Sequence, residues 1–163
     1  MGSDDDFTEF AAARWPRLLR SAIVLGCSPE EAEDLVQSTL LRCYTSWSKV
    51  RRADNRDAYV ATMLLNTFRG SRRRHWWGER PSDHLPDVVV ADPSDAVVVT
   101  DSVVRSLTGL TVKQREVVVL RYYAQLSEKE TAAALGIAPG TVKSRLSAAL
   151  RHLATTLEPT GEH

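Results

Sequence analysis

The stretch LSEKETAAALGIAPGTVKSRLSAALRHL, residues 126–153, contains two helical patterns separated by the short break GIAP. Ser127 followed three residues later by Glu130 is the signature of a capping box, which begins the first helix. Gly136 suits the positive φ that ends a helix, and Pro139 suits the first position of the next one. The sequence therefore predicts a helix-turn-helix.

The second of these helices combines an apolar stripe with a basic opposite side. The stripe is expected to consist of Val142, Leu146, Ala149, Leu150 and Leu153. The other side carries Thr141, Lys143, Ser144, Arg145, Ser147, Ala148 and Arg151. From residue 141 to residue 154 there are three basic residues and no acidic one. A helical hairpin with a solvated basic face would need neither Gly136 followed by an apolar residue nor GTVKSR at the start of the second helix, so DNA binding with this helix in the major groove is favoured.

The charge of the chain is segregated along its 163 residues, although the formal net charge is zero. Residues 51–80 hold eight Arg against three acidic residues, and residues 81–110 hold five Asp against one Arg. Cys27 and Cys43 have neither disulfide nor zinc-site spacing. No apolar run is long enough to span a membrane, and no signal peptide is present, so a cytoplasmic protein is expected.

Helical periodicity dominates elsewhere, which predicts an all-α fold. We expect helices at 6–25, 30–47, 56–77, 97–107 and 111–122, with a loop at 49–55. Gly26 is expected to end the first helix, Ser28 and Glu31 to begin the second, and Thr111 to cap the last. The Pro- and Asp-rich stretch 80–95 is expected to be a linker. The predicted organisation is a helical domain at 1–79, the linker 80–95, a second helical domain at 96–157 and a tail at 158–163.

The stretch RGSRRRHWWGER, residues 69–80, interleaves five Arg with a His and two Trp. Arginine and indole groups hold phosphates and stack on unpaired bases. The alternative is a solvated basic helix end with Trp76 and Trp77 packed in the core. The polar loop that precedes Arg56 is a candidate pocket for a displaced base beside the same helix.

Taken together, the two halves resemble an extracytoplasmic-function (ECF) sigma factor of the sigma-70 family over nearly the whole chain. AEDLVQSTLLRCYTSW (32–47) is similar to regions 2.1–2.2, and RDAYVATMLLNTFRGSRRR (56–74) resembles regions 2.3–2.4. LTVKQREVVVLRYYAQLSEKETAAALGIAPGTVKSRL (110–146) resembles region 4. The resemblance implies a subunit of RNA polymerase that recognises the −10 and −35 promoter elements. This chain departs from the family at residues 147–150, which are neutral, whereas the family often has an arginine pair there.

The resemblance assigns three surfaces. The surface for the clamp helices of the largest polymerase subunit consists of Asp34, Leu35, Gln37, Ser38, Leu41 and Arg42. The surface for −10 DNA, both double- and single-stranded, consists of Arg51, Arg52, Asp54, Asn55, Asn66, Arg69, Arg72, Arg73, Arg74, Trp76 and Trp77. The surface for −35 DNA consists of Arg121, Ser127, Glu128, Lys129, Thr141, Lys143, Ser144, Arg145, Ser147, Ala148 and Arg151. The β flap of the polymerase and an anti-sigma factor are further implied partners.

Two other classes of function are open from the residues alone. A stand-alone LuxR-type regulator shares the LTxxQREV-like and TVK residues of 110–153, but its other domain would not contain AEDLVQ. An enzyme would need a catalytic arrangement, and no Ser/His/Asp set, phosphate loop or metal-ligand spacing is found. The sequence therefore predicts no catalytic residue, no metal, no cofactor and no membrane partner.

Overall fold

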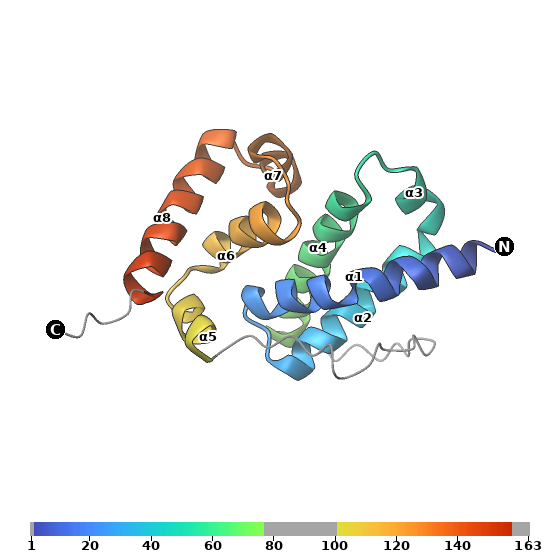
Figure 1. Ribbon diagram of the computed structural model, residues 1–163, viewed down its shortest axis with the longest axis horizontal. Helices are drawn as coiled ribbons and strands as arrows, with labels where there is room; N and C mark the ends of the chain where they lie inside the picture. The colour runs from blue at the N-terminus through green and yellow to red at the C-terminus, as the bar shows by residue number, and fades with distance from the viewer. Residues whose placement is uncertain (1, 77–100, 158–163) are drawn as a thin grey trace.

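The computed structural model describes residues 2–76 and 101–157, apart from the side chains of 74–76, 101–104 and 157. All regular structure within these ranges is helical, which confirms the predicted all-α class (Figure 1). The expected linker, 80–95, and the expected tail, 158–163, lie outside the described residues.

The first half of the chain forms α1 (Ser3–Leu25), α2 (Pro29–Thr45), α3 (Trp47–Arg52) and α4 (Arg56–Trp76). The long helices α1, α2 and α4 pack against one another, and the short α3 lies beside α4 at one end (Figure 1). The second half forms α5 (Asp101–Thr108), α6 (Val112–Val118), a π-helical turn (Val119–Tyr123), α7 (Glu128–Leu135) and α8 (Pro139–Leu157).

The predicted boundary between the first two helices is confirmed. Gly26 ends α1 with φ 113°, and the amide of Cys27 donates to the carbonyl of Ala22 at 3.1 Å. The Ser28 hydroxyl accepts from the Glu31 amide at 3.2 Å, and the Glu31 carboxylate accepts from the Ser28 amide at the same distance. This capping box satisfies two amides that would otherwise lack partners at the start of α2.

Two other predicted boundaries are wrong. α1 begins at Ser3 rather than at residue 6, because three successive aspartates fall in its first turn, where negative charge is favourable. The predicted loop at 49–55 is helical as far as Arg52. The cause is that Trp47 and Val50, one turn apart, are both buried, with exposed fractions of 6% and 0%.

Thr111 caps α6 as predicted, since its hydroxyl accepts from the Gln114 amide at 3.1 Å. The helix expected to run to residue 122 instead widens into the π-helical turn at Val119. The amide of Leu126 then returns to the carbonyl of Leu120 at 2.9 Å, so the chain reverses sharply before α7.

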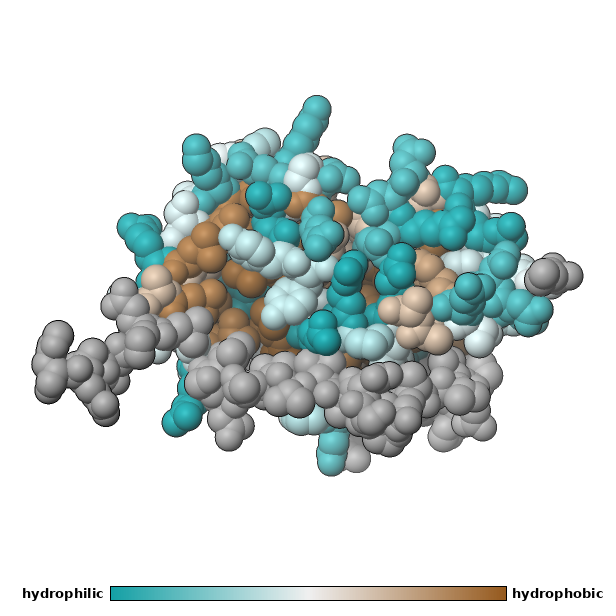
Figure 2. All heavy atoms as spheres, viewed as in Figure 1, coloured by the Kyte–Doolittle hydropathy of each residue, from teal (hydrophilic) through white to brown (hydrophobic). Residues whose placement is uncertain are grey.

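One hydrophobic cluster spans both halves of the described chain. Leu40 and Leu64 of the first half and Leu120 and Leu126 of the second belong to it, each 0–1% exposed. α1 packs against α5, α6 and the π-helical turn. In the face drawn in Figure 2, hydrophilic side chains project from the rim and hydrophobic residues lie between them. The two halves therefore lie directly against each other.

The substitution Gly26→Ala should lower the free energy of unfolding by about 1–2 kcal/mol. A side chain is disfavoured at φ 113°, and the added methyl group would meet the Arg115 guanidinium. Gly140→Ala is the matched control, because nothing lies within 4 Å of its added carbon, and it should stabilise by about 0.5–1 kcal/mol. Urea denaturation of both variants measures the difference, and equal stability of Gly26→Ala and the parent would contradict it.

Candidate nucleic-acid interface

The predicted helix-turn-helix is present in α7 and α8. The Ser127 hydroxyl accepts from the Glu130 amide at 3.0 Å, and the Ser127 amide donates to the Glu130 carboxylate at 2.9 Å. Gly136 adopts φ 67° and ψ 36°, which ends α7. Ile137 packs against the cluster that contains the fully buried Val142. These contacts fix the angle at which α8 leaves the turn.

The outer side of α8 carries most of the residues predicted for −35 DNA. The exposed ones are Lys143, Ser144, Ser147 and Arg151, and the half-buried ones are Thr141, Arg145 and Ala148. The apolar stripe differs from the prediction at Leu150, which is 40% exposed. Leu150 lies eight residues after Val142, about 80° round the helix from it, and therefore at the edge of the buried face.

The remaining residues predicted for −35 DNA lie before and at the start of α7. Lys129 is exposed, Glu128 is half-buried, and the Ser127 hydroxyl is used in the cap. Arg121 is held by the protein, because its Nη1 donates to the carbonyl of Leu126 at 2.5 Å. Its Nε is buried with no hydrogen-bond partner in the described part of the chain. Arg121 is half-buried and positions the start of α7.

The residues predicted for −10 DNA on α4 form an exposed polar side of that helix. Asn66, Arg69, Arg72 and Arg73 are all exposed. The Arg72 guanidinium lies 4.9 Å from the centre of the Phe68 ring, a cation–π contact that holds it near the helix surface. The side chains of Arg74 and Trp76, and the whole of Trp77, lie outside the described residues.

The turn between α3 and α4 opens onto a cleft of about 540 Å³. Asn55 caps α4, because its Oδ1 accepts from the amide of Ala58 at 3.0 Å. One wall of the cleft is the turn together with α4 from Ala58 to Asn66, and the opposite wall includes Leu126 and Glu130 of the second half. The predicted base pocket thus lies in a cleft between the two halves.

The other residues predicted for this turn lie at its rim. Arg51, Arg52 and Asp54 are exposed, and Asp54 lines the cleft. Arg51 lies 3.7 Å from the Asp6 carboxylate, with both side chains about half exposed, so this ion pair is weak.

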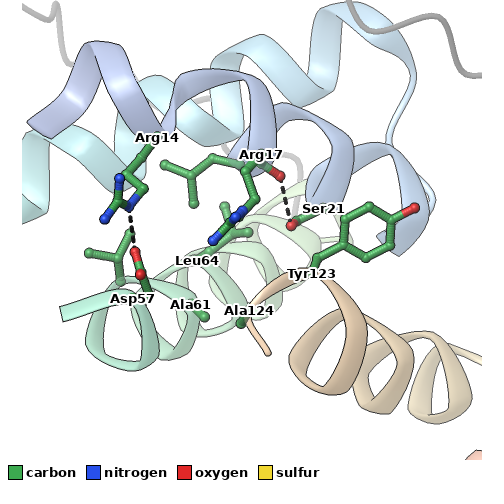
Figure 3. Close-up of a pocket in the computed structure, with 10 residues that line it drawn as sticks. Arg14, Arg17, Ser21, Asp57, Ala61, Leu64, Tyr123 and Ala124 are labelled. Carbon is green, nitrogen blue, oxygen red and sulfur yellow. Dashed lines mark hydrogen bonds and ion pairs between the residues drawn. The ribbon is translucent and has the colours of Figure 1, made fainter. Parts of the chain in front are cut away.

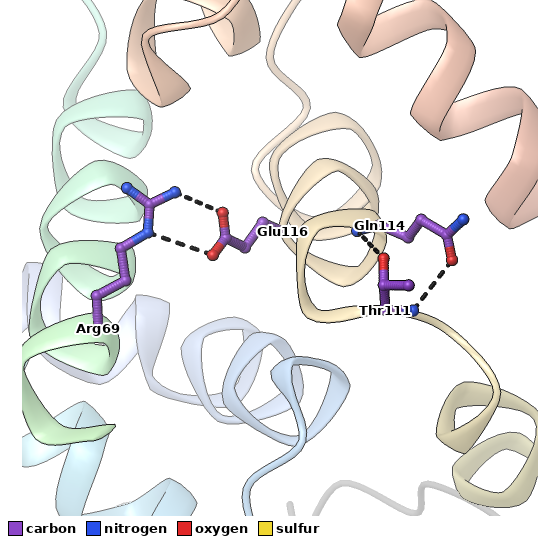
Figure 4. Close-up of polar contacts among 4 residues, drawn as sticks. All are labelled: Arg69, Thr111, Gln114 and Glu116. Atoms are coloured by element: carbon purple, nitrogen blue, oxygen red, sulfur yellow. Dashed lines mark hydrogen bonds and ion pairs between the residues drawn. The ribbon is translucent and has the colours of Figure 1, made fainter. Parts of the chain in front are cut away.

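The surface predicted for −10 DNA contacts the second half through two polar pairs. Arg69 donates from Nη2 to Glu116 Oε2 at 2.5 Å and from Nε to Oε1 at 3.2 Å (Figure 4). Asn55 Nδ2 donates to Glu130 Oε2 at 3.4 Å. The Glu116 side chain is 6% exposed and that of Arg69 41%. Hydrogen bonding to Glu116 is the main reason that the pKa of Arg69 lies above its ordinary value.

Glu116 is a functional candidate that the sequence analysis missed. It lies 47 residues from Arg69, so no local spacing joins them. The sequence did contain a signal for Glu116: helical spacing places it on the same face as Val119 and Leu120, which are both buried. A carboxylate on an apolar helix face requires a partner.

The residues predicted to face the polymerase lie along α2. Asp34 and Arg42 are exposed, and Gln37, Ser38 and Leu41 are half-buried. Leu35 differs, because it is 5% exposed and belongs to the core. It supports the predicted docking face from beneath.

A second cavity, of about 20 Å³, lies where α1, α4 and the end of the π-helical turn meet (Figure 3). Arg14 donates from Nε to Asp57 Oδ1 at 2.5 Å at one side, and Tyr123 lies at the other. This volume suits about one water molecule and is far below that of a cofactor pocket.

Among the described residues, no group of three or more His, Cys, Asp or Glu is placed to hold a metal. Burial raises the pKa of Cys27 to about 11 and that of Cys43 to about 12, which disfavours the reactive thiolate. Within the same residues, no helix is long and apolar enough to cross a membrane.

Comparison with known proteins connects both halves to one family. Residues 13–78 match "Sigma-70 region 2", and residues 100–153 match "Sigma-70, region 4". An RNA polymerase sigma-E factor of Streptomyces avermitilis is 40% identical over 158 residues, which cover 94% of this chain and 86% of that one. The ECF RNA polymerase sigma factor SigL of Mycobacterium tuberculosis is 32% identical over 160 residues, which cover 95% and 88%.

A solved structure agrees in fold. The sigma factor RpoE of Bartonella quintana, in complex with the anti-sigma factor NepR, is 27% identical, with a TM-score of 0.74 over 96% of this chain and 99% of that one. The chain belongs to the ECF sigma factors of the sigma-70 family, which direct promoter-specific transcription initiation by RNA polymerase. The match of residues 13–78 to region 2 removes the support for a stand-alone LuxR-type regulator.

The capping carboxylate of α7 generates a pH prediction. Hydrogen bonds from the backbone and side chain of Ser127 are the largest causes that lower the pKa of Glu130 from 4.5. The charged form is favoured in the native state, so its contribution to stability is present above the ordinary pKa and is lost as pH falls through the lowered native pKa. Glu130→Gln should therefore flatten the acid side of the stability profile.

Urea denaturation between about pH 3 and pH 7 measures this profile. Ser127→Ala is the matched variant, since it removes the hydroxyl but keeps the amide, and it should flatten the profile only in part. Parallel profiles for Glu130→Gln and the parent would contradict the assignment.

Proposed function

We propose that this chain is a specificity subunit without a catalytic step of its own, in which α8 reads the −35 element and α4 with its adjoining cleft holds the −10 strand. The observation that carries the proposal is the outer side of α8. Lys143, Ser144 and Arg151 are exposed there. α8 follows the turn at Gly136 and contains no acidic residue between positions 141 and 154. The polymerase core performs the chemistry.

The basic side chains of α8 support both positioning and readout. Lysine carries a compact charge suited to phosphate, whereas arginine presents a planar fork that pairs with two acceptors of guanine. Arg145 lies in the first turns of α8, where side chains reach base edges. We assign base readout to Arg145 and positioning on the backbone to Arg151, with Lys143 in either role.

The −10 function is supported by the cleft beside α4. Displacing a base from the duplex costs a few kcal/mol, and stacking returns about 1–3 kcal/mol per base only when the strand is already unpaired. The cleft of about 540 Å³ is within the size range of ligand pockets, and Asn66 lines it. The cleft and α4 therefore act on the open complex rather than on initial recognition.

The docking of the polymerase is assigned to the exposed part of α2, with Asp34 and Arg42 directed outward. Binding of the β flap of the polymerase is assigned to the second half of the chain. An anti-sigma protein is a further proposed partner, because the Bartonella quintana relative is found in complex with one. We infer that the chain acts in the cytoplasm, together with the polymerase.

Asn66→Ala combined with Arg73→Ala should reduce promoter opening with little effect on the closed complex. Both residues are exposed, so the fold should be retained. Permanganate reactivity of −10 thymines and run-off product, measured with core polymerase, should both fall. A template with a pre-melted bubble should restore most of the product. If closed-complex affinity falls as much as opening and the bubble restores nothing, α4 merely adds charge and the proposal fails.

Arg145→Ala and Lys143→Ala separate readout from positioning. A base-reading arginine should lose about 1–3 kcal/mol and relax the preference at one −35 position. A phosphate-contacting lysine should weaken all sequences alike and lower the slope of log K against log salt by about 0.9. Transcription from a library of −35 sequences measures both, and an unchanged preference in Arg145→Ala would refute its assignment.

A further inference from the structure

Two guanidinium groups meet beside the end of α1. A methyl carbon placed on Gly26 would collide with Arg115 Nη1 and would lie 3.3 Å from Arg72 Nη2. Both nitrogens therefore lie close to one point at the surface of the turn that follows α1. Arg72 belongs to α4 and Arg115 to α6, so three helices contribute to this point. We refer to Arg72 and Arg115 together as the double-arginine site.

The double-arginine site has no carboxylate partner within the described residues. Three other arginines of the same part of the chain form ion pairs, namely Arg14 with Asp57, Arg51 with Asp6 and Arg69 with Glu116. Glu31 acts electrostatically on the neighbouring Cys27, but its carboxylate accepts from the Ser28 amide at 3.2 Å as part of the cap of α2. No ion pair therefore offsets the charges of Arg72 and Arg115.

The proximity of these two charges is unfavourable by itself, because like charges repel at short range. Burial and the Arg72 charge both lower the pKa of Arg115. The nearest compensation is the carbonyl of Leu25, which lies 3.5 Å from Arg115 Nη1 and carries only the partial charge of a helix end. An anion bound between the two guanidinium groups would replace the repulsion by two charge-assisted contacts.

Both guanidinium groups are held in place without such an anion. Arg115 is half-buried, and its Nε donates to the carbonyl of Leu107 at 3.0 Å. Arg72 lies against the ring of Phe68, 4.9 Å from its centre. Neither Nη2 group donates to another described residue. The donors are thus preorganised, which lowers the entropy lost when a ligand binds.

We propose that Arg72 and Arg115 form a binding site for a terminal phosphoryl group, supplied by inorganic phosphate or by a small phosphomonoester. Such a group carries a charge of about −1.5 to −2 at pH 7, which matches two guanidinium groups. Its oxygens accept the parallel N–H donors of arginine. A phosphodiester of a nucleic-acid backbone carries one charge and has a sugar on each side, so it fits the half-buried Arg115 less well.

Thermal denaturation in sodium phosphate tests the site, with sodium chloride of equal ionic strength as the reference. For a site half-filled at about 1 mM, about 10 mM phosphate should raise the Tm by about 3–6 °C, because the ligand binds only the folded chain. Arg72→Gln should lose at least half of this rise. The variant should stay folded, since Arg72 is exposed. Equal Tm values of the parent in phosphate and chloride would overturn the site.

Arg42→Gln is the matched control for the loss of one positive charge. Arg42 is exposed and lies near the other end of α2, about 20 Å along that helix from Pro29. This variant should keep the full rise. Equal losses in Arg42→Gln and Arg72→Gln would show that phosphate responds only to net charge, and would overturn the site.

Arg115→Lys keeps the charge but replaces the planar fork by a single ammonium group. Its Kd for phosphate, obtained from the dependence of the Tm on phosphate concentration, should rise at least threefold. Each Tm is compared with that of the same variant in chloride, so a loss of stability by itself does not count as a loss of binding. An unchanged Kd would remove Arg115 from the site.

Three ligands distinguish the source of the phosphoryl group: inorganic phosphate, adenosine 5′-monophosphate and a single-stranded oligonucleotide whose two ends carry hydroxyl groups. Binding of the first two should weaken in Arg115→Lys, whereas binding of the oligonucleotide should not. If only the oligonucleotide depends on Arg115, the site belongs to a nucleic-acid surface and the proposal fails. These measurements use no promoter or polymerase, so their failure leaves the proposed function to its own test.

Discussion

The arrangement of the two halves depends on the carboxylate of Glu116. The Glu116 side chain lies on the apolar side of α6, is 6% exposed, and faces away from its own half of the chain (Figure 4). A buried carboxylate without a partner costs several kcal/mol, so the fold must bring a cation to it. Arg69 of α4 supplies that cation through two hydrogen bonds. The pair therefore constrains where α6 lies on the first half.

Other contacts follow from that placement. With α6 beside α4, the neighbouring Arg115 reaches the end of α1 and lies 3.5 Å from the carbonyl of Leu25, where a helix favours positive charge. Burial, with the nearby Arg72 charge as a smaller cause, lowers the pKa of Arg115. The π-helical turn that follows α6 then packs against α1 and completes the common core. The ion pair and the common core thus belong to one continuous interface, in which Arg69, a side chain predicted to bind DNA, also has a structural role.

The local parts of the fold were predictable because they depend on residues three or four positions apart. The capping residues Ser28, Thr111 and Ser127 and the turn at Gly136 lie where the sequence placed them. The wrong predictions concern burial. The loop expected from residue 49 is helical because Val50 is drawn into the core, and Leu150 is exposed because its neighbour Ala149 occupies the buried side. The predicted DNA-binding sets stay predictions, although α4 and α8 leave most of their polar members exposed.

By itself the sequence determined the helical class, the helix-turn-helix and the family, since caps, helical periods and motif order are properties of short stretches. Only the tertiary structure decided that Glu116 binds Arg69, 47 residues away, and that Asn55 meets Glu130, 75 residues away. It also decided that Arg121 is held by Leu126. The physical reason is that a contact between distant residues depends on how whole helices pack. Many alternative pairings of charge are compatible with the same local pattern, and burial of a common core selects one of them.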